Sequence, residues 1–233
     1  MLFRSAARLS LVDIIEELEK IRGLLRIRLS SIEAGDVTEE LIAQMANSEK
    51  LCRHLHIPIQ SGNNLILKRM NRRYSSQDYL RLIQRIKKRI PEIAITTDVL
   101  VGFPGETEEN FKNTCALIKE ILPLGAHIFS YSPRPATPAA NFAGKIVAVT
   151  IKERRQRLEK IAQECSIKYR QQFLNQEMLV LFEAPAKENQ GCWEGYTDNY
   201  LKVLVKSRQD LQNQLIAVRL KRIVKECLFA VFC

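Results

Sequence analysis

Apolar residues recur at helical spacing in several segments of the first half of the chain. In residues 75–90 they form one stripe, and Ser75 with Asp78 is spaced as an N-terminal cap. Ser10 and Asp13 have the same relation before residues 11–21 and resemble a capping box. The spacing predicts helices over residues 11–21, 36–46, 75–90 and 111–122.

Short apolar runs lie between these helical segments and predict strands. They cover residues 25–32, 55–60, 93–101 and 126–131. Strands that alternate with helices at intervals of roughly 30 to 40 residues are typical of βα units in a parallel sheet or barrel. Pro58 lies inside the second run and cannot donate to a ladder, which conflicts with a central strand there.

The pattern changes after residue 149. Residues 150–174 predict one long helix, and short apolar runs separated by turn residues follow it at 178–184, 193–205, 214–224 and 227–232. We therefore expect an α/β fold in three parts: a parallel (βα) barrel in 1–149, a linking helix in 150–174 and a small β-barrel in 175–233.

Charge and composition narrow the class of partner. The 233 residues are 46% hydrophobic, enough for a sizeable core, and the formal net charge is +10. Excess Lys and Arg favour nucleic acid as a partner, although a generically basic protein has the same composition. No apolar run approaches the roughly 20 residues needed to span a bilayer, so a cytoplasmic protein is expected.

The six cysteines are scattered, and no two have CxxC or CxxxC spacing. This spacing predicts no zinc or cluster site, and therefore no metal ligand set, in the chain. The imidazoles are His54, His56 and His127, and the last two lie inside predicted strands and are interpreted as core or lining residues rather than as ligands, acids or bases.

Polar residues follow each predicted strand, where parallel αβ folds place their ligands. A set without a catalytic triad favours binding of a polar small molecule. Gly102 is expected to allow close approach of a ligand, with free N–H groups of the following helix facing it. The strand-end residues are Ser30, Ser31, Glu33, Gln60, Ser61, Asp98, Gly102, Ser130, Tyr131 and Arg134.

Four of these segments together resemble a known family. "RIRLSSIE", "LHIPIQSG", "TTDVLVGFPGET" and "HIFSYSPRPATPAA", in this order, are similar to the later part of the radical S-adenosylmethionine methylthiotransferases that modify tRNA. The small barrel resembles the TRAM domain of that family, an OB-like RNA-binding module. "RLSSIE" is closer to the branch that acts on N6-threonylcarbamoyladenosine than to the branch that acts on isopentenyladenosine.

The resemblance implies S-adenosylmethionine and [4Fe-4S] clusters as cofactors and the anticodon stem-loop of tRNA as partner. It implies a cofactor-binding set of Ser30, Glu33, Gln60, Ser61, Asp98, Gly102 and Glu106. Glu106 has a second interpretation, as an acid that stabilises the start of a helix. The implied substrate and RNA set is Tyr131, Arg134, Trp193, Tyr196, Lys202, Lys206, Arg219, Lys221 and Arg222. Trp193 is equally interpreted as filling the small barrel.

The chain departs from the family by an absence. It has no CxxxCxxC loop and no earlier domain with three cysteines, and it has four βα units where the family has six. We therefore expect a partial barrel that lacks its first strands and an exposed edge beside residues 25–32. Alone it is expected not to cleave S-adenosylmethionine, and the missing N-terminal portion is an expected partner. A tRNA-binding module without catalysis is the alternative, and an unrelated αβ-barrel enzyme is a third interpretation.

Overall fold

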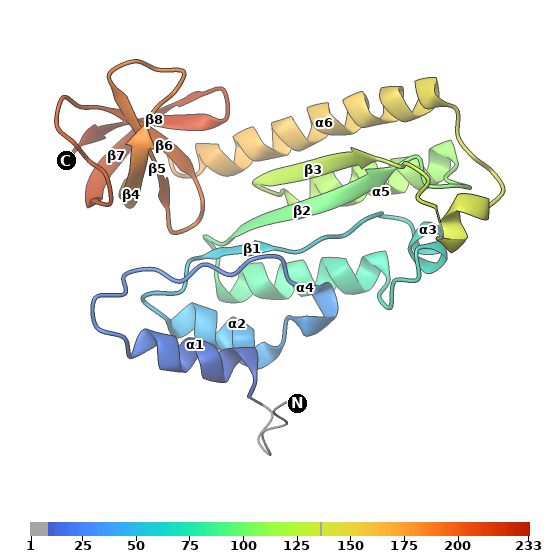
Figure 1. The fold of residues 1–233 in the computed structure, drawn as a ribbon, viewed down its shortest axis with the longest axis horizontal. Coiled ribbons are helices and arrows are strands. Elements are labelled where there is room, and N and C mark those ends of the chain that lie inside the picture. The colour runs from blue at the N-terminus through green and yellow to red at the C-terminus, as the bar shows by residue number, and fades with distance from the viewer. Residues whose placement is uncertain (1–8, 136) are drawn as a thin grey trace.

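A computed structural model describes residues 9–135 and 137–233 (Figure 1). The helices are α1 (Leu11–Glu19), α2 (Glu39–Asn47), α3 (Asn64–Arg69), α4 (Ser76–Arg89), α5 (Glu108–Ile121) and α6 (Ala148–Gln171), with short 3-10 turns η1 (Ala34–Asp36) and η2 (Pro138–Asn141). The strands are β1 (His54–His56), β2 (Ala94–Val101), β3 (Gly125–Ser130), β4 (Glu177–Pro185), β5 (Cys192–Thr197), β6 (Lys202–Lys206), β7 (Leu215–Val224) and β8 (Cys227–Phe232).

The two capping boxes predicted from sequence are confirmed. The hydroxyl of Ser10 accepts from the Asp13 N–H while the Asp13 carboxylate accepts from the Ser10 N–H, and Ser75 and Asp78 make the same pair of bonds. Each box satisfies two N–H groups that a helix start otherwise leaves without partners. Both helices therefore begin next to residues whose side chains bond the first free N–H groups.

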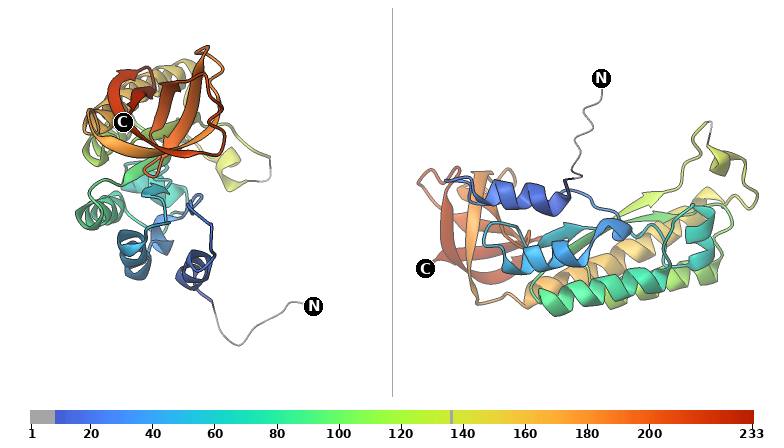
Figure 2. Two further views of the ribbon diagram at one scale, coloured as in Figure 1. Left: turned by 90° about the vertical axis from the view of Figure 1, so that its left-hand side faces the viewer. Right: turned by 90° about the horizontal axis from the view of Figure 1, so that it is seen from below.

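Strands β1, β2 and β3 form one parallel sheet in that order. Alternate residues of β2 point to opposite faces, and Ile95, Val99 and Val101 are fully buried in the main core. Helices α4, α5 and α6 pack on that side of the sheet and contribute to this core (Figure 2), together with residues of α1 and α2. Thr96 and Asp98 consequently face the other side, which we call the polar face of the sheet.

The first predicted strand differs in the structure. Residues 25–32 run parallel beside β1, but they form only two isolated bridges, Ile27 to Leu51 and Ser31 to His56. The offset between partners changes from one bridge to the next, so an extra residue interrupts the ladder. The second predicted strand, 55–60, is also shorter: β1 ends at His56, before Pro58.

The second half of the chain follows the prediction more closely. Strands β4 to β8 close into a barrel with the order β4-β5-β6-β8-β7 around a core of its own, and the segment 193–205 divides into β5 and β6. Helix α6 runs along the sheet and contacts both β3 and β7. No helix in the described ranges is both long and apolar enough to cross a membrane.

The small barrel docks at the amino ends of the parallel strands. Tyr200, in the β5–β6 loop, stacks on His54 at the start of β1, with ring centroids 4.4 Å apart. Arg26 donates to the backbone carbonyls of Tyr196 and Leu179, and Arg28 lies 4.6 Å from the centre of the Tyr200 ring. The carboxyl ends of the strands lie at the other end of the sheet (Figure 1).

Candidate functional site

The polar face of the sheet gathers a connected set of side chains from three strands. His54 Nε2 and His56 Nδ1 each lie 2.9 Å from Thr96 Oγ1. His56 Nε2 lies 3.2 Å from Asp98 Oδ2, and His127 is the register partner of Asp98 on β3. Because parallel strands hold these residues side by side, the set has a fixed spacing.

His54 is neutral in this arrangement. Burial lowers its pKa to about 3, and the positive charge of Arg28 acts in the same direction. A neutral imidazole has one N–H and one acceptor nitrogen, which lets Thr96 connect it to His56 through one hydroxyl. His54 therefore belongs to the packing beneath the site.

The carboxyl end of the sheet presents polar groups around Asp98. The Gln60 N–H donates to the Asp98 carbonyl and the Leu100 N–H donates to the Gln60 carbonyl, which fixes Gln60 at a φ of 67°. The hydroxyl of Tyr131 is buried without a hydrogen-bond partner, and its ring packs edge-on against Phe103. An unpartnered buried hydroxyl is costly, so a ligand that accepts from it gains affinity.

The turn at Gly102 differs from the expectation. Gly102 has a φ of +83°, and a Cβ there would lie 2.6 Å from Ile151 Cγ1 of α6, so helix packing rather than a ligand occupies that space. The Gly102 N–H donates to the carboxylate of Glu106. Thr107 caps the start of α5, so the N–H groups expected to be free are in part already bonded.

Glu106 has a structural role, because it forms a buried ion pair with helix α6. Its carboxylate lies 2.9 Å from Arg154 of α6, and both side chains are almost completely buried. Burial raises the pKa of Glu106, while the Gly102 N–H and Arg154 act against that shift. Its geometry matches the interpretation as a structural acid at the start of α5 better than a ligand role.

The other predicted cofactor residues separate into two kinds. Ser61 is buried, and its hydroxyl lies 3.4 Å from Thr114 Oγ1 of α5, where it supports the turn after β1. Glu33 is half-exposed and forms an ion pair with Arg72 at 2.9 Å. Ser30 is exposed near the end of the irregular segment beside β1. Gln60 and Asp98 are joined by a backbone hydrogen bond at the carboxyl edge of the sheet, and Tyr131 directly follows β3 at the same edge.

The predicted RNA residues fall at opposite ends of the molecule. Tyr131 and Arg134 follow β3 at the carboxyl end, whereas the others belong to the barrel at the amino end. Trp193 packs against the barrel core, which favours its interpretation as a filling residue. Register pairs Tyr196 with Lys202, and pairs Phe229 with Arg222, on the outer face of the barrel.

The cations of the small barrel differ in whether they form ion pairs. Lys202 forms an ion pair with Glu194 at 2.9 Å, and Arg219 lies 3.6 Å from Glu177. Lys206, Lys221 and Arg222 are exposed and form no ion pair within the described ranges. The guanidinium of Arg222 lies 5.1 Å from the centre of the Phe229 ring. This outer face combines free cations with an aromatic ring, as single-stranded nucleic-acid sites do.

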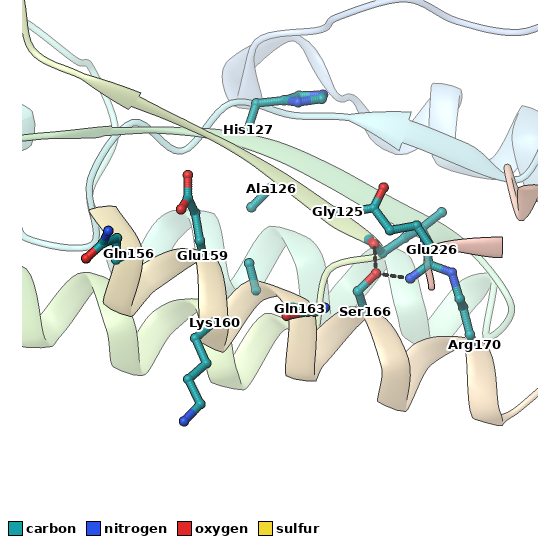
Figure 3. A pocket seen from close by; sticks show the side chains of 12 residues that line it. Gly125, Ala126, His127, Gln156, Glu159, Lys160, Gln163, Ser166, Arg170 and Glu226 are labelled. Atoms are coloured by element: carbon teal, nitrogen blue, oxygen red, sulfur yellow. Dashed lines mark hydrogen bonds between the residues drawn. The ribbon is translucent and has the colours of Figure 1, made fainter. Parts of the chain in front are cut away.

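A pocket of about 670 Å³ lies between β3 and α6 (Figure 3). Its polar lining mixes acids, amides and cations, including Glu159, Gln163 and Arg170. His127 lines this pocket, but no member of the predicted cofactor or RNA sets does. The pocket is therefore separate from the predicted strand-end residues.

Comparison with known proteins points to one superfamily. The model of the Radical SAM superfamily matches residues 5–118. This part of the chain, about half of it, is therefore similar to radical SAM proteins. Its fold is similar to that of coproporphyrinogen III oxidase (HemN) from Escherichia coli, a radical SAM enzyme, with a TM-score of 0.51 and 11% identity over 74% of this chain and 46% of that chain.

Two curated relatives show where the similarity extends. The chain is 40% identical over 210 residues to threonylcarbamoyladenosine tRNA methylthiotransferase MtaB of Bacillus subtilis, covering 89% of this chain and 47% of that protein. It is 39% identical over 207 residues to tRNA-2-methylthio-N(6)-dimethylallyladenosine synthase of Caldicellulosiruptor saccharolyticus, covering 89% and 44%. The chain thus spans about half the length of these relatives, and the similarity includes much of the small barrel.

The radical SAM family implies S-adenosylmethionine and an iron–sulfur cluster. The described residues offer polar groups for the first but no ligand set for the second. The Asp98 carboxylate and the unpartnered Tyr131 hydroxyl, at or beyond the carboxyl ends of their strands, are an acceptor and a donor that suit a polar nucleoside. The cysteines do not suit a cluster: Cys52, Cys115 and Cys165 are buried separately, and no group of them comes together in the described ranges. The described residues therefore fit the nucleoside cofactor but not the cluster.

Proposed function

We propose that this chain forms part of a tRNA methylthiotransferase that adds a methylthio group to C2 of N6-threonylcarbamoyladenosine beside the anticodon. The observation that carries the proposal is the 40% identity over 210 residues, which extends through the sheet and into the barrel. The "RLSSIE" segment favours this adenosine over isopentenyladenosine, although relatives of both kinds have nearly equal identity.

In this proposal the carboxyl end of the sheet is one wall of the cofactor and substrate cavity. Gln60, Asp98 and Tyr131 would hold S-adenosylmethionine, with Ser30 beside them. When bound with its cluster, that cofactor supplies radical chemistry, and the protein supplies position and exclusion of water. The chain's own residues bind and orient; their polar groups match a ribose and an adenine rather than an acid–base pair.

We also propose that residues 175–233 act as a TRAM-like module that binds the anticodon stem-loop, with 1–149 as the partial (βα) barrel and 150–174 as the link. The exposed Lys206, Lys221 and Arg222 support this, because free cations on one small domain give salt-dependent attraction to phosphates. A tRNA-binding module without catalysis is favoured as the second candidate by the dispersed cysteines.

Fluorescence anisotropy with a labelled anticodon stem-loop tests the RNA-binding part. Lys206→Ala and Lys221→Ala together are expected to weaken binding. They should also reduce the slope of log affinity against log salt concentration by roughly 0.7 to 0.9 for each phosphate that the variant no longer neutralises. Lys152→Ala, an exposed lysine at the far end of α6, is the matched control and is expected to bind as the unmodified chain does. Salt-independent binding, or equal weakening in all variants, would oppose an RNA role for the barrel.

A further inference from the structure

Three metal-ligating side chains meet on the polar face of the sheet, and neither the sequence patterns nor the proposed function uses them together. His56 on β1, Asp98 on β2 and His127 on β3 each offer one ligand atom, and these atoms all lie within 4.8 Å of one another. We propose that they form a binding site for one divalent transition-metal ion of the kind that imidazole and carboxylate prefer, such as Zn²⁺ or Co²⁺.

The spacing of the three atoms fits such an ion closely. Bond lengths of about 2.1 Å and tetrahedral angles separate two ligand atoms on zinc by about 3.4 Å. His56 Nε2 and Asp98 Oδ2 are already 3.2 Å apart. No two of the three ligand atoms are more than 4.8 Å apart, and the exposed His127 side chain is the one expected to adjust when an ion binds.

The backbone holds this set without further adjustment. Asp98 and His127 are direct register partners, and His56 is paired with Thr96, two residues before Asp98. The side chains therefore project from neighbouring parallel strands onto the same face. Sites on strands are positioned more precisely than sites on loops, since strand backbones do not rearrange when a ligand binds.

The surroundings also suit a metal ligand. Metal-bound histidines usually donate their second ring N–H to an acceptor, which fixes the tautomer. Thr96 Oγ1, 2.9 Å from His56 Nδ1, can accept that proton and leave the Nε2 lone pair facing Asp98. Asp98 supplies a negative charge at moderate exposure, and His56 is mostly buried. Three protein ligands leave a fourth position open for water or another molecule.

Titration of the untagged, full chain with Co²⁺ and Zn²⁺ tests the site. A Cys233→Ser background removes the exposed thiol, and the absorption spectrum of Co²⁺ distinguishes thiolate from imidazole and carboxylate ligands. One equivalent is expected to bind without thiolate bands. Asp98→Asn and His127→Gln are each expected to weaken binding at least about tenfold.

Asp36→Asn, an exposed carboxylate in η1, is the matched control and is expected to leave the affinity unchanged. His127 is exposed, so its variant is expected to keep the fold, which circular dichroism checks independently. The proposal is wrong if neither ion binds at millimolar concentration, or if Asp98→Asn and His127→Gln bind as tightly as Asp36→Asn.

Discussion

Gly102→Ala tests whether the turn after β2 is shaped by packing or by a ligand. Two costs are expected in the free protein. The φ of +83° strains any residue with a Cβ by about 1–2 kcal/mol. The new methyl would also lie 2.6 and 2.7 Å from Ile151 Cγ1 and Cδ1, an overpacking contact of about 1–3 kcal/mol. The sum is a loss of about 2–5 kcal/mol in the free energy of unfolding.

Urea unfolding of Gly102→Ala, Ile151→Ala and the double variant separates these costs. Shortening Ile151 removes the contact but not the backbone strain, so the double variant is expected to recover about 1–3 kcal/mol relative to additivity. The reasoning fails if Gly102→Ala unfolds at the same urea concentration as the unmodified chain, or if the two substitutions are additive. Either result would mean that helix α6 does not require glycine at this turn.

Three further predictions concern single side chains. His54, with a pKa of about 3 when folded, takes up a proton in the unfolded chain near pH 6.5, so stability is expected to fall between pH 6.5 and 3 by up to about 1.4 kcal/mol per pH unit. His54→Gln should flatten that part of the stability curve, and an unchanged slope would contradict the assignment. Glu106→Gln removes the closer of the two carboxylates that pair with the buried Arg154, the other being Glu108, and is expected to cost about 3 kcal/mol in urea unfolding; a loss below about 1 kcal/mol would contradict it. Tyr131→Phe removes an unpartnered buried hydroxyl and is expected to raise the unfolding free energy by about 1 kcal/mol, whereas a clear loss would reveal a partner for that group.

The predictable parts of the fold are those that local chemistry determines. Ser75 and Asp78 cap a helix start through their own side chains, and the apolar run in 93–101 forms the buried strand β2. Residues 25–32 were harder to predict, because their irregular pairing depends on an extra residue in the facing segment and on contacts of Arg26 with the distant barrel. A pattern within residues 25–32 cannot predict contacts with residues that are so distant in the sequence.

The grouping of the candidate residues follows from strand topology, whereas their contacts do not. Strand ends predicted Gln60, Asp98 and Tyr131 at one edge, because parallel topology brings the carboxyl ends of strands together. The expectation that Gly102 leaves room for a ligand was wrong. The space beside Gly102 is filled by the Ile151 side chain of α6. The grouping of His56 with His127 was missed, although the register of three neighbouring strands, once assumed, would have placed them on one face.

The central claim is that this chain supplies the later part of the barrel and the RNA-binding module of a tRNA methylthiotransferase. The most direct test replaces the matching segment of the Bacillus subtilis relative with this chain and expresses the hybrid in a strain that lacks the modification. Mass spectrometry of tRNA nucleosides is predicted to detect 2-methylthio-N6-threonylcarbamoyladenosine. A soluble hybrid that forms no methylthiolated nucleoside would contradict the claim, and one that forms only the isopentenyladenosine product would contradict the proposed substrate.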